Sequence, residues 1–154
     1  MPDLIKRTSL IVRDAEVSAR WYEFVLGMHR AMDTPFVLSG EQLAAGRKGD
    51  RLRLVIMAGA DEQTGAIGLM QWLDPVMDLP AERASQVRFG MPVFVVASQD
   101  CAATVKRARL MGSRVHCEPR EWAVTGFGGV EQTMLGASVF DPDGYFFEIN
   151  QRLA

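Results

Sequence analysis

The sequence has few of the residues from which common metal sites and disulfide frameworks are built. Its 154 residues include two histidines, His29 and His116, and two cysteines, Cys101 and Cys117. Two histidines exclude a metal site made mainly of imidazoles, and two cysteines do not make a disulfide framework. His116 and Cys117 are adjacent, but neighbours on a strand point to opposite faces and could not share a proton directly. We therefore expect both cysteines to be small apolar residues rather than nucleophiles.

A strong charge of one sign and long apolar runs are also lacking. The formal net charge is −2, so the chain has no basic footprint for nucleic acid or anionic membrane surfaces. Its longest apolar stretch, residues 91–97, is far too short to span a bilayer, and residues 1–7 contain no apolar signal core. We expect a cytosolic protein that binds neither nucleic acid nor membrane.

The most distinctive stretch that is present runs from Val139 to Asn150. Asp141-Pro142-Asp143-Gly144 has the residues of a type I turn, and apolar, strand-like segments on both sides predict a tight β-hairpin. Alternation along the second strand divides its residues between two faces: Tyr145, Phe147 and Ile149 on one, and Phe146, Glu148 and Asn150 on the other. Glu148 is therefore either an edge-strand carboxylate in water or a carboxylate presented to a cavity.

Two halves of the chain share one order of predicted elements. In the first half, a strand precedes a helix that Asp14 caps and Gly27 ends, and three strands follow; the four strands are at 8–12, 30–35, 51–57 and 66–73. In the second half, Ser98 is the expected cap and Gly112 the expected end of the helix, and the strands are at 91–97, 114–119, 132–140 and 145–150. The apolar face of this second helix is predicted to comprise Cys101, Val105, Ala108 and Met111.

This order predicts an α+β fold built from two βαβββ modules within one domain of residues 1–154. Module one spans residues 5–73, module two spans residues 88–151, and a linker of residues 74–87 containing Pro75 and Pro80 joins them. Because one module alone leaves a sheet face uncovered, we expect two modules to pair and enclose a cavity. The pairing can occur within one chain or between two chains.

These features resemble the vicinal oxygen chelate superfamily, which includes glyoxalase I, extradiol dioxygenases, and the fosfomycin and bleomycin resistance proteins. The resemblance rests on the closing hairpin and on the opening segment Leu10-Ile11-Val12-Arg13-Asp14, followed by Trp21-Tyr22 and Leu26-Gly27. It implies a curved sheet of the glyoxalase and bleomycin-resistance type. It also implies that Glu148 occupies the place of the family's last metal ligand.

The resemblance implies four ligand positions, two in each module, and most of them have lost their ligands. The first is Arg7, its counterpart in module two is Met91, and the ligand of the last strand of module one falls at Gly68, or at Gln71 if the register slips by one. One carboxylate beside a cation and a thioether cannot hold a divalent ion, and a guanidinium stays protonated. We therefore expect no metal and no cofactor, with Arg7 forming an ion pair with Glu148 across the cavity.

Several other residues are candidates to line the cavity. Trp72, Trp122, Phe127 and Phe146 can form an apolar pocket that stacks planar ligands, or they can be ordinary core and loop packing. Arg7, Met70 and Met91 join them as candidate ligand-binding residues. The glycine-rich stretch 125–129 lacks phosphate-loop spacing, and we expect a flap over the cavity.

The sequence therefore predicts a protein that binds a small, largely apolar or aromatic molecule without a metal. The alternative is an enzyme of this superfamily (a lyase, isomerase or dioxygenase). Such an enzyme would either be metal-free, with Glu148 as catalytic acid or base and Arg7 steadying an oxyanion, or use unrecognised metal ligands. Apolar residues on both faces of 51–57 and 66–73 predict a symmetric homodimer.

Overall fold

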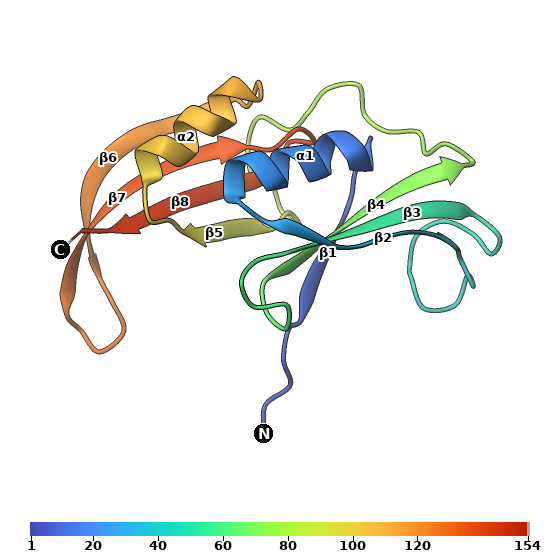
Figure 1. Cartoon of the computed structure of the whole chain (residues 1–154), viewed down its shortest axis with the longest axis horizontal. Coiled ribbons are helices and arrows are strands. Elements are labelled where there is room, and N and C mark those ends of the chain that lie inside the picture. The colour runs from blue at the N-terminus through green and yellow to red at the C-terminus, as the bar shows by residue number, and fades with distance from the viewer. Residues whose placement is uncertain (154) are drawn as a thin grey trace. The chain divides into compact units, whose positions relative to one another are not determined.

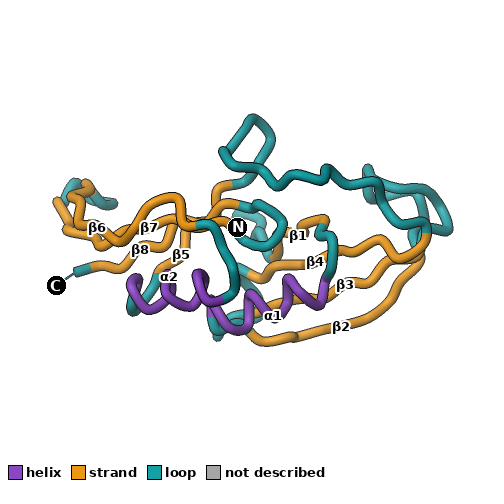
Figure 2. The backbone as a smooth tube through the Cα atoms, turned by 90° about the horizontal axis from the view of Figure 1, so that it is seen from above, coloured by secondary structure: helices purple, strands orange, loops and turns teal. Residues whose placement is uncertain are grey.

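The computed structural model describes residues 1–153, and the chain divides into two compact units, Met1–Glu82 and Arg83–Ala154. Unit one contains β1 (Arg7–Ile11), α1 (Ala15–Leu26), β2 (His29–Val37), β3 (Arg51–Ala58) and β4 (Ala66–Asp74). Unit two contains β5 (Val93–Ala97), α2 (Cys101–Leu110), β6 (Val115–Thr125), β7 (Glu131–Phe140) and β8 (Phe146–Arg152). Figures 1 and 2 show α1 beside the sheet of β1–β4 and α2 beside the sheet of β5–β8.

The two sheets have the same topology. Their strand orders are β1-β4-β3-β2 and β5-β8-β7-β6, and in each the first strand pairs in parallel with the last one. The remaining neighbours in each sheet are antiparallel. The predicted pair of βαβββ modules in an α+β fold is therefore confirmed.

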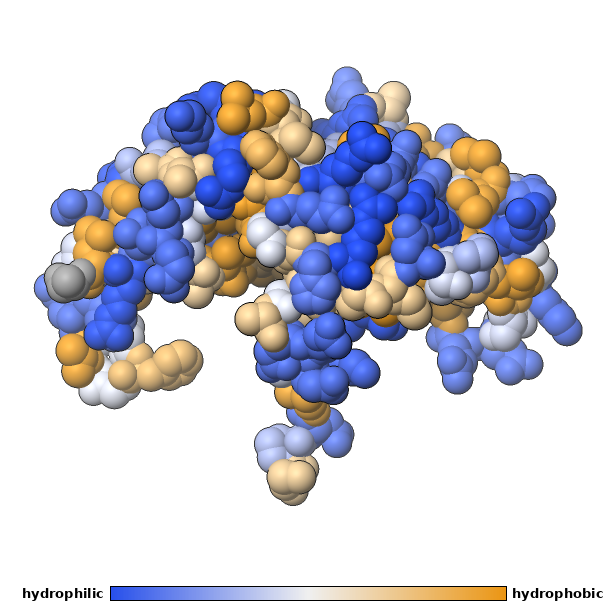
Figure 3. Space-filling view, viewed as in Figure 1, coloured by the Kyte–Doolittle hydropathy of each residue, from blue (hydrophilic) through white to orange (hydrophobic). Residues whose placement is uncertain are grey.

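Helix α1 begins and ends where its sequence predicts. The Asp14 side chain accepts hydrogen bonds from the backbone N–H groups of Glu16 and Val17, and Gly27 takes the left-handed conformation at φ 68° that ends the helix. The exposed side of α1 carries mainly hydrophilic side chains (Figure 3). On its inner side, Trp21 and Tyr22 are fully buried and contact each other edge to face, with ring centroids 5.1 Å apart.

Three arginines surround Glu16 in the first turn of α1. Its carboxylate accepts hydrogen bonds from Arg20, Arg30 and Arg53 at 2.8–3.0 Å. These hydrogen bonds, with that from Arg30 the largest cause, hold the pKa of Glu16 well below its ordinary value. Arg53 also binds Asp33 and lowers the pKa of that carboxyl. The network ties α1 to β2 and β3.

The predicted cap of α2 was wrong. The helix begins two residues later than expected because Asp100, in an extended conformation, accepts a hydrogen bond from the backbone N–H of Ala103. Ser98 instead accepts from the N–H of Asp100 and stabilises the turn that leads into the helix. The buried face also differs from the predicted one: Thr104 is buried with Cys101, Val105 and Ala108, whereas Met111 lies past the end of the helix and is exposed.

The predicted end of the strand at 114–119 was also wrong, because β6 continues to Thr125. Its pairing with β7 shifts register between Val115 and Cys117 and again between Cys117 and Arg120. These irregularities interrupt the alternation of side chains, so the sequence pattern does not look like one long strand. As a result Trp122 lies on a strand of the sheet and not in a loop.

The closing hairpin has the predicted turn and faces. Gly144, at φ 94°, donates its N–H to the Asp141 carbonyl, while the Asp141 carboxylate accepts from the N–H groups of Asp143 and Tyr145. Along β8, Phe147 and Ile149 are buried, whereas Phe146, Glu148 and Asn150 on the other face are half-buried. Among residues 1–153, no helix is both long enough and apolar enough to cross a membrane.

Candidate functional site

The face of the second sheet that carries Glu148 is hollowed. A concavity of about 400 Å³ is bordered by residues of β6, β7 and β8: His116, Cys117, Arg120, Trp122, Gly136, Ala137, Ser138, Phe146, Glu148 and Asn150. We call this the unit-two hollow. Three of the predicted site residues, Trp122, Phe146 and Glu148, therefore come together within one module.

The polar residues of the unit-two hollow are cross-strand neighbours on β6, β7 and β8. Glu148 pairs in register with Ser138, and Asn150 pairs with Gly136, which in turn pairs with Arg120 on β6. Within residues 83–153, no side chain forms an ion pair or a hydrogen bond with the Glu148 carboxylate. A half-buried carboxylate beside aromatic rings is available to a ligand or to a cation from outside this unit.

His116 and Cys117 both border this hollow, although alternation predicts opposite faces for them. The register shifts on either side of Cys117 account for this difference. The His116 ring lies edge-on to Phe146, with centroids 5.9 Å apart. Cys101, in contrast, is the first residue of α2 and lies on its buried face, where burial is the main reason that the pKa of its thiol is raised. A buried thiol with a raised pKa is a poor nucleophile.

Phe127 lies away from the lining of the unit-two hollow. It is in the turn between β6 and β7, in the glycine-rich stretch 125–129, and its side chain is fully exposed. Gly128 and Gly129 both have positive φ, and Gly126 donates its N–H to the carbonyl of Val130. The stretch is thus the tip of a long hairpin.

Unit one has a hollow of its own on the face away from α1. Its volume is about 460 Å³, and it is bordered by Arg7, Ser9, Phe36, Val37, Leu38, Ser39, Gly40, Gln42, Leu43, Leu54 and Met70. We call this the unit-one hollow. The Arg7 guanidinium donates to the hydroxyl of Ser9 at 3.3 Å. Arg7 and Met70, both predicted site residues, therefore border one concavity.

Trp72 lies next to this hollow and belongs to a hydrophobic cluster. It packs with Leu38, Leu52 and Met70 and is 4% exposed. Its indole N–H donates to Asp50 at 3.0 Å, so the loop that joins β2 to β3 is fastened over it. Gly46 makes this packing possible, because a Cβ there would come within 2.9 Å of the Trp72 ring.

The backbone pairing defines which residues of the two modules are equivalent. The N–H of Val12 donates to the carbonyl of Met70, and in the same way the N–H of Ser98 donates to the carbonyl of Asn150. One residue further along, the side chain of Gln71 accepts the N–H of Ala15 at 2.9 Å. Gln151 accepts the N–H of Cys101 at the same distance. The two units are therefore built on one repeated scheme of hydrogen bonds.

This equivalence fixes the counterparts of the family's ligand positions. Gly68 pairs with Ser9 as Glu148 pairs with Val95, so Gly68 and Glu148 are equivalent. Of the two candidates, Gly68 therefore has the pairing that corresponds to Glu148, whereas the side chain of Gln71 points to α1 on the other face. By the same pairing the counterpart of Arg7 is Val93. Aligning Arg7 with Met91 was wrong by two residues because the alignment used Ser98 as the cap.

The residues at these four positions do not fit a divalent metal ion. Arg7, Gly68 and Val93 offer no oxygen, imidazole or thiolate donor, which leaves one carboxylate, Glu148. At Gly68, a Cβ would come 2.6 Å from the Ser9 hydroxyl and 3.2 Å from Cδ of Arg7, so these two side chains cover the glycine. Within each unit, the described residues contain no group of three His, Cys, Asp or Glu side chains suited to a metal.

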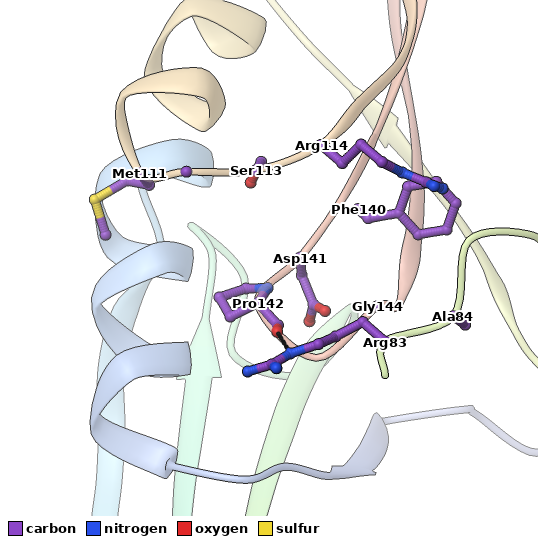
Figure 4. A pocket seen from close by; sticks show the side chains of 10 residues that line it. Arg83, Ala84, Met111, Ser113, Arg114, Phe140, Asp141, Pro142 and Gly144 are labelled. Atoms are coloured by element: carbon purple, nitrogen blue, oxygen red, sulfur yellow. Dashed lines mark hydrogen bonds between the residues drawn. The ribbon is translucent and has the colours of Figure 1, made fainter. Parts of the chain in front are cut away.

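Unit two has a second concavity, and its two arginines form structural contacts. Figure 4 shows it between the end of α2, the turn at Asp141–Gly144 and residues 83 and 84, with a volume of about 400 Å³. Arg83 donates to the Pro142 carbonyl at 3.3 Å. Arg114 donates to the Ser85 carbonyl at 2.6 Å and lies 4.2 Å from the centre of the Phe140 ring. The two arginines fasten residues 83–85 to the closing hairpin.

The sequence matches the Glyoxalase/Bleomycin resistance protein/Dioxygenase superfamily over residues 4–149. The chain belongs to this superfamily. No curated protein matches the chain. Membership agrees with the repeated modules and with the resemblance of the opening and closing segments.

Solved structures of superfamily proteins share the fold. A glyoxalase family protein from Bacillus cereus aligns with a TM-score of 0.80 at 13% identity, covering 98% of this chain and 95% of that one. Glyoxalase I of Leishmania major aligns with a TM-score of 0.63 at 16% identity, covering 97% and 87%. The fosfomycin resistance protein FosX from Mesorhizobium loti gives 0.56 at 17% identity, covering 97% and 91%. At these identities the likeness is one of fold.

Proposed function

We propose that this superfamily member binds a small, largely apolar or aromatic molecule in the cavity between paired modules, without a metal ion. The observation that carries the proposal is the set of residues at the four equivalent positions. Only Glu148 among them is a metal-ligand type, and the side chains of Arg7 and Ser9 cover Gly68. Metal-assisted chemistry needs several donors around one ion, and three positions supply none.

The lining of the two hollows supports a ligand with a large apolar surface. The unit-one hollow contributes Phe36, Leu54 and Met70, and the unit-two hollow contributes Trp122 and Phe146. Pockets for small molecules are typically apolar, with a few polar groups that fix orientation. Here Glu148, Asn150 and Ser9 are such groups. Arg7 is the residue that we expect to balance the charge of Glu148 when no ligand is bound.

A fluorescence titration tests this proposal directly. N-phenyl-1-naphthylamine is an uncharged probe that becomes fluorescent in apolar sites, and saturable binding is expected in the presence of EDTA. Phe146→Ala should weaken binding by about tenfold or more, because it removes apolar contact area. Phe89→Ala is the matched control, since Phe89 is fully exposed and borders neither hollow. A titration without saturation, or binding that EDTA abolishes, would contradict the proposal.

A metal-free enzyme is the second candidate, and the position of Glu148 favours it. A half-buried carboxylate without a partner in its own unit can serve as a general base if a bound molecule presents an acidic proton. Glu148→Gln separates the two functions: it should abolish turnover of a substrate while leaving the binding of an apolar probe nearly unchanged.

A further inference from the structure

Trp122 stands out among the residues of the unit-two hollow because an aromatic side chain of this size is 42% exposed on a sheet face. It lies on β6, the edge strand of its sheet, directly opposite Met134 of β7. Trp122 therefore presents a large apolar and aromatic surface to the unit-two hollow.

Gly136 determines where the indole lies. It is two residues beyond Met134 on β7 and is therefore the diagonal neighbour of Trp122. A Cβ built on Gly136 would be 2.5 Å from Nε1 of Trp122 and 3.2 Å from its Cδ1, so the pyrrole part of the indole occupies the space of the missing side chain. The φ of Gly136 is not positive, so alanine is compatible with the backbone there. The glycine leaves room for the indole and, less tightly, for Asn150, whose Oδ1 would be 3.2 Å from the same Cβ.

We infer that Trp122, seated on Gly136, is a stacking platform that selects a planar aromatic ring in the ligand. This inference rests on the proposed function and specifies its ligand class. Nε1 and Cδ1 of the indole lie close to Gly136, the side chain remains 42% exposed, and Phe146 and Asn150 border the same hollow. A planar ring can lie against the indole over its whole face, whereas a saturated ring of equal size cannot. Gly136 is a positioning residue, since it acts through Trp122.

Calorimetric titration with a matched pair of probes tests the inference. 2-Naphthol and decahydro-2-naphthol share one carbon skeleton and one hydroxyl group, but only the first is planar and aromatic. The native protein should bind 2-naphthol about three- to tenfold more tightly, the range expected for a single aromatic contact. Trp122→Leu should remove this preference, and Trp122→Phe should retain part of it.

Gly136→Ala tests whether the position of the Trp122 indole matters for binding in a protein that is still folded. It should reduce the affinity for 2-naphthol more than the affinity for decahydro-2-naphthol, because the added methyl group displaces the indole. Gly59→Ala is the control, because a Cβ at Gly59 has no atom within 4 Å and Gly59 borders neither hollow. Far-ultraviolet circular dichroism establishes whether each variant is folded. If Gly136→Ala does not fold, the comparison of the native protein with Trp122→Phe still tests the inference.

The outcomes distinguish this inference from the proposed function. Equal affinities of the native protein for the two probes would overturn the stacking platform and leave an apolar binding site intact. A preference that survives Trp122→Leu would also overturn it. No binding of either probe would overturn the proposed function together with the inference.

Discussion

Gly68 and Glu148 occupy equivalent positions in the two sheets, one residue without a side chain and the other with a carboxylate. Each lies on the last strand of its module and pairs with the parallel first strand, Gly68 with Ser9 and Glu148 with Val95. In unit one the stem of Arg7 covers the glycine. The two equivalent positions therefore differ in chemistry: a cationic side chain covers the glycine in unit one, whereas unit two has a carboxylate there.

The pairing of Arg7 with Glu148 is the first prediction. If the modules enclose one cavity, a double-mutant cycle with Arg7→Ala and Glu148→Gln should give a coupling free energy of about 1 kcal/mol or more. Arg7→Ala should be the more damaging single change, costing about 3–5 kcal/mol if water is excluded and much less if it is not. Glu148→Gln is milder, since an amide oxygen still accepts from the guanidinium.

Urea unfolding of the four proteins measures this coupling. A control cycle combines Glu148→Gln with Arg120→Ala in place of Arg7→Ala. Arg120 borders the same hollow as Glu148 but forms no ion pair with it. Arg120→Ala and Glu148→Gln should be additive. Additive effects in the Arg7 cycle, or a larger coupling in the control cycle, would contradict the pairing.

The second prediction concerns the two glutamines at the helix starts. Gln71→Met should lower the free energy of unfolding by about 1–2 kcal/mol, because the N–H of Ala15 loses its acceptor in a partly buried place. Gln151→Met should have a similar effect at Cys101. Thermal or urea unfolding measures both, with Gln63→Met in an exposed turn as control. Unchanged stability in both variants would show that water replaces these acceptors.

The third prediction is the acid dependence of the Glu16 network. Because its folded pKa is depressed, Glu16 contributes stability at pH values above its unfolded pKa of about 4.3, and that contribution is lost as pH falls further. Native protein should therefore be more stable than Glu16→Gln at pH 7, and the difference should shrink below about pH 4. Urea unfolding at pH 7 and pH 3 measures it. A difference that is the same at both pH values would contradict this account.

The fourth prediction is a symmetric homodimer. Leu54 and Ile56 are only half-buried on the face of β3 away from α1, and Val95 on β5 is exposed. An apolar sheet face of this kind is more stable when a second copy covers it. Sedimentation velocity at micromolar concentration should show a dimer. A single monomeric species at that concentration would count against it.

The sequence was most informative where one residue determines local geometry. Asp14, Gly27 and the Asp141–Gly144 turn act within a few residues, so their caps and bends were predicted correctly. The duplicated order of elements then predicted the modules. The predicted start of α2 was wrong because Ser98 and Asp100 are both good N-cap residues and local chemistry does not rank one above the other.

The site was predicted less well because it depends on pairing between strands. The register shifts in β6 interrupt its side-chain alternation, so the part of the strand after Pro119 was not predicted. The position of Trp122 on the sheet and its contact with Gly136 were therefore not foreseen. A signal was nevertheless present, since an isolated glycine inside a strand often marks close approach by another group. Both Gly68 and Gly136 are such residues. The alignment of Met91 with Arg7 was wrong for a related reason. The cap of α2 was placed two residues too early, and this error shifted the alignment of the two modules by two residues.

We propose that this superfamily member works without a metal ion, because Glu148 is the one residue of a metal-ligand type at the four equivalent positions. Elemental analysis of the purified native protein and of Glu148→Gln tests it most directly. We expect far less than one equivalent of Zn, Fe, Mn or Ni per chain in both proteins. About one equivalent of any of these metals in the native protein, lost on Glu148→Gln, would contradict it and indicate a metalloenzyme.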